Sequence, residues 1–89
     1  MSRNVSLTLQ NTGDSRSIVD AIMADNATAQ VREFPSMTKI DCPDKLVIRA
    51  GSVTSRIGRP WDVQEIHLSV ISLSGSVDEE EDEFTLFWK

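Results

Sequence analysis

Hydrophobic and polar residues alternate along several segments of this chain, a period-two pattern that is typical of strands buried on one face. The predicted strands are residues 5–9, 30–34, 37–41, 46–49, 66–70 and 83–88. Prolines and other turn-forming residues lie between most of these segments. The alternation shifts by one residue at Ile71, and this shift predicts a β-bulge near residues 70–72.

Two other segments place their apolar residues at helical spacing. The first helix is predicted to begin at Asp14 or Ser15, either of which can cap it, and to end at Asn26 after about three turns. Its apolar stripe consists of Ile18, Val19, Ile22 and Met23. The second helix is short, with Ser52 as a candidate cap and Gly58 as the signal for its end.

The resulting order of elements is β-α-β-β-β-α-β-β, which predicts an α+β fold with two helices packed on a mostly antiparallel sheet. A chain of 89 residues is too short for two separate cores, so residues 1–89 are expected to form a single small domain. Residues 72–76, Ser-Leu-Ser-Gly-Ser, are small and mostly polar and are expected to form a loop. Gly75 would let another molecule approach this loop closely.

The net charge of −5 is confined to one segment. Residues 78–83 are six consecutive acidic residues, whereas acidic and basic residues balance in residues 1–77. The basic residues are scattered, so neither nucleic acid nor a membrane is an expected partner. No apolar run is long enough for a membrane span or a secretory signal. The single cysteine, Cys42, cannot close an intramolecular disulfide, and these features together predict a cytoplasmic protein.

Few residues are available for catalysis or for metal binding. His67 is the only histidine, so a zinc site would have to recruit carboxylates, and no serine-nucleophile motif is present. The isolated glycines form no phosphate-binding loop, and the acidic run lacks the glycine of a calcium loop. We therefore expect no catalytic, cofactor-binding or metal-binding residue. Two alternatives stay open: a small-molecule binder or minor enzyme that uses His67 and Glu65, and an adaptor that recruits a basic partner through residues 78–83.

Several stretches of the chain resemble one known family. They are residues 57–63 (Ile-Gly-Arg-Pro-Trp-Asp-Val), residues 70–79 (Val-Ile-Ser-Leu-Ser-Gly-Ser-Val-Asp-Glu), residues 32–37, residues 45–49 and residues 83–88. In these stretches the chain is similar to the regulatory protein, also called the effector or coupling protein, of bacterial multicomponent phenol hydroxylases. The wider family includes the effector proteins of toluene and soluble methane monooxygenases. The similarity covers essentially the whole chain.

This resemblance implies a non-catalytic component that holds no cofactor and docks on a diiron hydroxylase oligomer. Proteins of this family couple the use of O2 and electrons to the hydroxylation of an aromatic substrate such as a phenol or toluene. They also compete or cooperate with the flavin and iron–sulfur reductase for the hydroxylase. The same partners are expected for this chain.

The resemblance also implies which residues contact the hydroxylase. The first group is the predicted loop and its start, Ile71, Ser72, Leu73, Ser74, Gly75 and Ser76, and the second is Arg56, Arg59 and Trp61. The second group is also suggested by residue type, because Trp and Arg are common anchors at protein interfaces. A bulky residue at Ser74 or Gly75 is expected to weaken docking and to leave the fold intact.

Overall fold

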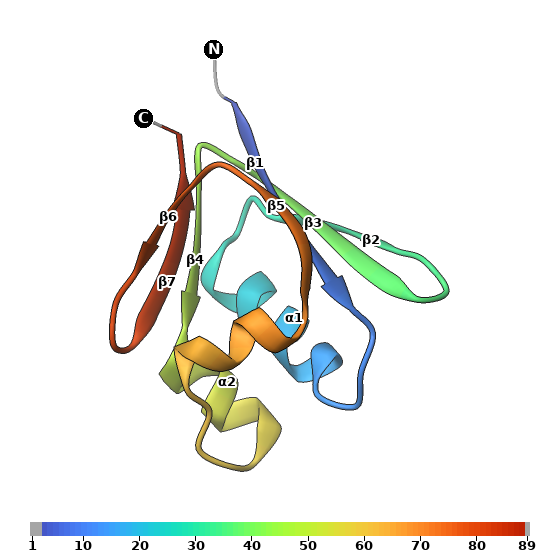
Figure 1. The fold of residues 1–89 in the computed structure, drawn as a ribbon, viewed down its shortest axis with the longest axis vertical. Helices are drawn as coiled ribbons and strands as arrows, with labels where there is room; N and C mark the ends of the chain where they lie inside the picture. Colours follow the sequence, from blue (N-terminus) through green and yellow to red (C-terminus); the bar gives the residue numbers. More distant parts are fainter. Residues whose placement is uncertain (1–2, 89) are drawn as a thin grey trace.

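The computed structural model describes residues 3–88, which form two antiparallel sheets with helices gathered at one end (Figure 1). The four-stranded sheet has the order β2-β3-β1-β5 and consists of β1 (Asn4–Gln10), β2 (Gln30–Glu33), β3 (Met37–Pro43) and β5 (Val70–Ser74). The three-stranded sheet has the order β4-β7-β6 and consists of β4 (Lys45–Arg49), β6 (Ser76–Glu79) and β7 (Glu83–Phe87). The helices are α1 (Ser15–Asp25), α2 (Ala50–Ile57) and the 3-10 helix η1 (Val63–Leu68). The predicted α+β class is confirmed.

The hydrophobic core lies between the two sheets and the helices. Leu7 of β1 is opposite Ile40 of β3, and both side chains are fully buried. In the second sheet, Ile48 of β4 is opposite Phe84 of β7, and these side chains are buried in the same core. α1 packs against α2 and β4 and buries Ile22. Each such side chain contributes about 1.5–3 kcal/mol when it leaves water, so the alternation of apolar residues decides which face of each strand points inward.

The α-helices form close to their predicted positions. α1 begins at Ser15 and is followed by Asn26 as its C-cap, as the sequence predicts. α2 begins at Ala50, two residues before Ser52, so the prediction that Ser52 caps this helix is wrong. Gly58 follows α2 with a left-handed φ of 82°, which confirms the predicted end of the helix.

The strand predicted at residues 66–70 is wrong, because most of this segment lies in η1. A capping box stabilises the start of η1: Asp62 accepts a hydrogen bond from the backbone N–H of Gln64, and Glu65 accepts one from the backbone N–H of Asp62, both at 2.9 Å. These side chains satisfy backbone donors at the start of the helix, so the local cap overrides the alternating pattern. The next strand, β5, begins only at Val70.

The loop predicted at residues 72–76 is also wrong, because two strands meet there. β5 pairs with β1 up to Ser74, and β6 pairs with β7 from Ser76 onward. Gly75 alone lies between the two strands, and both Gly75 and Ser76 are half-buried. Pairing of β5 with the distant strand β1 and of β6 with its neighbour β7 therefore orders a segment whose composition is typical of a loop.

The predicted β-bulge is confirmed in β5. Leu9 of β1 is opposite Val70, whereas the preceding residue of β1, Thr8, is opposite Ser72. Ile71 is therefore the extra residue, which bends the strand and changes the direction of the side chains around it.

Two bends carry the chain from one sheet to the other. β3 continues into β4 at Asp44, where φ is 66°, and β5 continues into β6 at Gly75, where φ is 128°. A Cβ atom at position 75 would lie 3.1 Å from Cγ1 of Val5 and 3.2 Å from the carbonyl oxygen of Phe87. The positive φ and the tight packing both require glycine. A bulky residue at Gly75 would therefore strain the fold, so a loss of docking in such a variant could not be assigned to the interface alone.

Candidate docking surface

β5 forms one edge of the four-stranded sheet, and its side chains divide between the core and the solvent. Leu73 is opposite the buried Leu7 and packs against the core. Ser72 and Ser74 alternate with Leu73 and are exposed on the outer face of the sheet. Ile71 is 54% exposed, because the bulge leaves it outside the regular pairing. Of the predicted contact residues on β5, Ile71, Ser72 and Ser74 are thus accessible to a partner.

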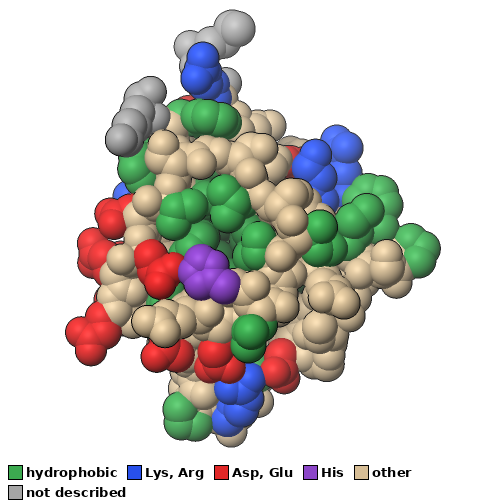
Figure 2. Space-filling view, in the orientation of Figure 1, with side chains coloured by type: hydrophobic (Ala, Val, Ile, Leu, Met, Phe, Trp, Pro, Cys, Tyr) green, Lys and Arg blue, Asp and Glu red, His purple; other side chains and the backbone are tan. Residues whose placement is uncertain are grey.

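Two further hydrophobic side chains are exposed on elements that adjoin β5. Leu68, at the end of η1, is 79% exposed, and Val77 of β6 is 43% exposed. Together with Ile71 they make up what we call the apolar surface, and Figure 2 shows hydrophobic side chains around the single histidine on this face. The sequence pattern missed Leu68 because the wrongly predicted strand placed it on the inner face. It missed Val77 because no strand was predicted between the expected loop at residues 72–76 and the acidic run.

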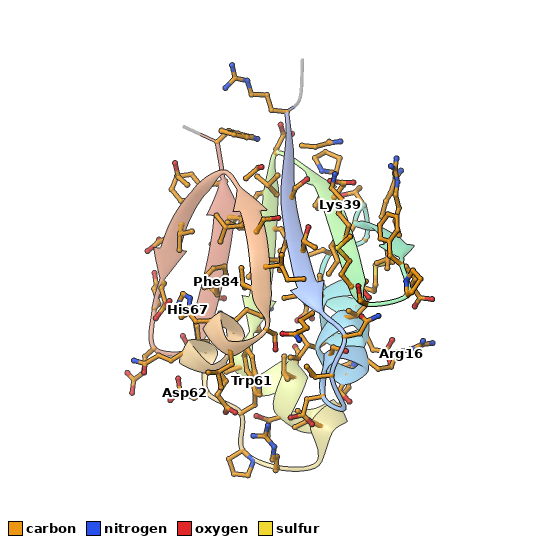
Figure 3. All side chains as sticks on the ribbon, turned by 45° about the vertical axis from the view of Figure 1, so that its right-hand side comes forward. Arg16, Lys39, Trp61, Asp62, His67 and Phe84 are labelled. Carbon is orange, nitrogen blue, oxygen red and sulfur yellow. The ribbon has the colours of Figure 1, made fainter. Side chains whose placement is uncertain are left out.

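His67 links η1 to the second sheet. Its Nε2 atom is 2.5 Å from Oε1 of Glu79 on β6, and its ring meets the ring of Phe84 edge to face at 5.9 Å between centroids. Figure 3 shows His67 and Phe84 next to each other. Glu65 has a different partner, Arg59, with 3.2 Å between Oε1 and Nη1. The structure therefore does not form the pair of His67 and Glu65 that a small-molecule or catalytic site would use.

Of the second predicted group of contact residues, Trp61 is buried, whereas Arg56 and Arg59 are exposed. Trp61 is only 5% exposed and is part of the core, so its ring cannot anchor a partner in this conformation. Nη2 of Arg59 is 2.8 Å from Oδ2 of Asp14, and this hydrogen bond, with the Glu65 carboxylate, raises the pKa of Arg59 above its ordinary value. Arg56 is exposed and donates to a carbonyl of its own helix at 3.1 Å. Figure 1 shows the α2–η1 connection at the opposite end of the molecule from the β5–β6 bend.

Comparison with known protein families matches residues 3–87 of this structure to the MmoB/DmpM family. The chain belongs to the MmoB/DmpM family. It is 42% identical over 89 residues to the phenol 2-monooxygenase stimulatory component DmpM of Pseudomonas sp. strain CF600, with 100% of this chain and 99% of that relative covered. A chain in a solved phenol hydroxylase–regulatory protein complex has a TM-score of 0.91 and 39% identity, with 98% of this chain and 100% of that chain covered.

A more distant structure shows the same fold. The soluble methane monooxygenase regulatory protein B has a TM-score of 0.76 and 17% identity to this chain, with 97% of this chain and 65% of that chain covered. The family indicated by the sequence motifs is thus confirmed by the family match, by the relative and by the structures.

The acidic run of this MmoB/DmpM member comprises the end of β6, the connection between β6 and β7, and the first residue of β7. Two of its carboxylates are paired, Glu79 with His67 and Glu83 with Arg49 at 3.4 Å. The others, Asp78, Glu80, Glu81 and Asp82, form no ion pair with any residue between positions 3 and 88. Figure 2 shows acidic side chains along the flank beside the histidine. This flank carries negative charge that the described part of the protein does not neutralise.

The described residues contain no group of three or more His, Cys, Asp or Glu side chains that is arranged to hold a metal ion. Cys42 is buried on β3, 3.5 Å from the hydroxyl of Thr28. Within residues 3–88 no helix has the length and apolar character needed to cross a membrane. The accessible features of the site are thus an apolar surface, small hydroxyl side chains on β5 and an acidic flank, which are groups suited to protein binding.

Proposed function

We propose that this chain is the stimulatory component of a bacterial diiron monooxygenase that hydroxylates phenol or a related aromatic compound. The match along the whole chain to DmpM, a stimulatory component of phenol 2-monooxygenase, carries this proposal. The likeness to a chain from a phenol hydroxylase–regulatory protein complex supports docking on the hydroxylase as its mode of action. In this proposal the hydroxylase holds the diiron centre and performs the chemistry, and the chain itself binds no cofactor.

A component of this kind acts through differential binding. A protein that binds one conformation of the hydroxylase more tightly than another shifts the population toward that conformation. A tenfold difference in affinity between the two conformations corresponds to about 1.4 kcal/mol, and it changes which conformation dominates when the two are close in energy. The favoured conformation couples O2 and the electrons of the reductase to hydroxylation, and docking competes or cooperates with the reductase. We place this complex in the cytoplasm.

The contact in this proposal is made by β5. Ile71, Ser72 and Ser74 face the solvent from a strand that is already paired with β1, so docking costs little conformational entropy. The small hydroxyl side chains allow the backbone of β5 to come close to the hydroxylase. Leu73 and Gly75 hold the strand in place from the core side and at the bend.

The experiment that tests the function is a titration of the purified protein into the hydroxylase and the reductase from the same source. Oxidised product and consumed NADH are measured in parallel at each ratio. We expect the ratio of product to NADH to rise and to saturate near one equivalent per active site. Product formation that ignores the added protein at every ratio would refute the proposed function.

A substitution at Ser74 tests the proposed contact strand. Ser74→Trp places a large side chain on the exposed face of β5, and Ser36→Trp places the same side chain on the exposed turn between β2 and β3. We expect Ser74→Trp to require at least about tenfold more protein for half-maximal stimulation, because the bulky ring separates the two surfaces. Equal stimulation by both variants, with equal unfolding temperatures, would exclude β5 as the contact.

A further inference from the structure

Residues 67–79 contain more exposed apolar area than β5 alone provides. Leu68, Ile71 and Val77 belong to three consecutive elements, η1, β5 and β6, and each is more than two-fifths exposed. The other exposed large hydrophobic residues between positions 3 and 88 are Met23 on α1, Phe34 after β2 and Trp88 after β7. Exposed apolar groups gathered on one side of a small protein are typical of an interaction surface, whereas single ones are ordinary.

The two sheet edges beside this apolar surface are also open. β5 and β6 are the edge strands of their sheets and are joined only through Gly75. The edge at β4 is covered differently, because the side chain of Asn26 bonds both the N–H and the carbonyl of Val47. The edge strand β2 carries the charged residues Arg32 and Glu33. The edge strands that carry or adjoin Leu68, Ile71 and Val77 are therefore β5 and β6.

His67 and Glu79 connect the elements of the apolar surface. His67 immediately precedes Leu68 on η1, and its contact with Glu79 reaches β6, two residues beyond Val77. This contact holds η1 against the second sheet in the free protein. The elements that carry Leu68 and Val77, η1 and β6, are thereby linked before any partner binds.

The connection between β6 and β7 borders the same face. Glu80, Glu81 and Asp82 are exposed, and we call these three residues the acidic turn. A partner that covers the apolar surface brings its own rim against these carboxylates. Lysine or arginine at that rim would pair with them, and acidic groups there would be repelled.

We propose, on the basis of the function proposed above, that the docking surface comprises Leu68, Ile71 and Val77 as its apolar centre and the acidic turn as one rim. Its occupant is a strip of the hydroxylase surface that is apolar in the middle and carries Lys or Arg side chains along one side. Two observations define this occupant: the apolar side chains gathered on one face, and the unpaired negative charge at one end of it. This assignment extends the contact beyond β5 and replaces the group around Trp61.

The apolar centre is tested by the affinity of the full-length protein for the intact hydroxylase, measured by titration calorimetry. Leu68→Ser is the informative variant, because Leu68 is 79% exposed and its replacement leaves the core unchanged. Phe34→Ser is the matched control, since Phe34 is a large hydrophobic residue that is 42% exposed in the connection between β2 and β3. We expect the Kd to rise about tenfold to a hundredfold for Leu68→Ser and less than about twofold for Phe34→Ser.

The acidic rim is tested by the dependence of that Kd on salt. Glu81→Gln/Asp82→Asn removes two charges from the acidic turn, and Asp25→Asn/Asp44→Asn removes two charges from exposed positions elsewhere. We expect the first double variant to bind more weakly at low salt and to show a flatter salt dependence. The second double variant should follow the wild-type curve. Identical curves for the two double variants would overturn the basic rim of the occupant.

The outcomes separate this inference from the function on which it rests. Wild-type protein that neither binds nor stimulates the hydroxylase would overturn the proposed function. Wild-type protein that does both, with Leu68→Ser and Phe34→Ser equally active, would leave that function standing and overturn the docking surface. Unfolding temperatures of Leu68→Ser and Phe34→Ser equal to that of the wild type would show that a change in affinity arises at the interface.

Discussion

Asn26 makes an unusual set of contacts whose removal should have a large effect on stability. Its side chain is buried just after the end of α1 and faces the edge of β4 that has no neighbouring strand. Nδ2 donates to the carbonyl of Ile22 at 2.8 Å and to that of Val47 at 2.7 Å, and Oδ1 accepts from the N–H of Val47 at 3.0 Å. The amide thus takes the place of a neighbouring strand and also bonds the last turn of the helix.

Asn26→Ala removes all three hydrogen bonds. Each is worth about 0.5–1.5 kcal/mol net, and a partly buried backbone group left without a partner costs about 1–3 kcal/mol. We therefore expect a loss of about 2–4 kcal/mol, a large part of the stability of a small domain. For a domain of this size the loss lowers the midpoint of thermal unfolding by roughly 10–30 °C.

Urea unfolding followed by tryptophan fluorescence, to which the buried Trp61 and the exposed Trp88 both contribute, measures this loss, with the exposed Asn4→Ala as the control. Asn26→Asp tests the direction in which stability changes with pH. A carboxylate at this position would face the carbonyls of Ile22 and Val47, so its pKa in the folded state would rise above the unfolded value of about 3.9. The folded state then binds more protons, and the variant loses stability as the pH rises above about 4. A free energy of unfolding for Asn26→Ala within about 0.5 kcal/mol of the wild type would refute the reasoning.

Three further predictions concern Gly75, Trp61 and Arg59. Gly75→Ala should lower the free energy of unfolding by about 2–5 kcal/mol, from backbone strain and overpacking against Val5, and an unchanged urea midpoint would contradict this. Trp61→Phe should lower the free energy of unfolding, because Trp61 is buried in the core. At a temperature where both proteins are folded, its Kd for the hydroxylase should stay within about twofold of the wild-type value, and a much higher Kd with unchanged stability would show that Trp61 contacts the hydroxylase. Arg59→Met should shift the urea midpoint only at low salt, because its ion pairs are exposed, and a shift that persists in high salt would contradict that reasoning.

The sequence was informative where local signals and burial agree. β1, β3, β4 and β7 bury alternate residues, so their patterns predicted them, and Gly58 marked the end of α2 through a backbone conformation that glycine adopts easily. The bulge at Ile71 was visible as a shift of the alternation. The family was visible in short motifs.

The errors arose where local and distant interactions compete. The alternation in residues 66–70 looked like a strand, although Asp62 and Glu65 have the spacing of a capping box that favours a helix. The segment around Gly75 has the composition of a loop, but β5 is ordered by pairing with β1, which is more than sixty positions away in the sequence. Pattern reasoning has no access to partners that are far apart in sequence.

The site was harder to predict for the same reason. Arg59 pairs with Asp14 across 45 positions, and His67 pairs with Glu79 across 12. Such contacts decide which side chains are held in the framework and which are accessible, and only the tertiary structure shows them. Residue type suggested Trp61 as an anchor, whereas its burial assigns it to the core.

Hydrogen–deuterium exchange of the protein, alone and in complex with the intact hydroxylase, tests docking through residues 67–79 most directly. β5 and β6 are edge strands, so some of their amides lack a partner in the free protein and should exchange quickly. Docking through residues 67–79 predicts slower exchange on binding in peptides from residues 66–79 and unchanged exchange in residues 30–36. Protection confined to α1 and β2, with residues 66–79 unchanged, would contradict it.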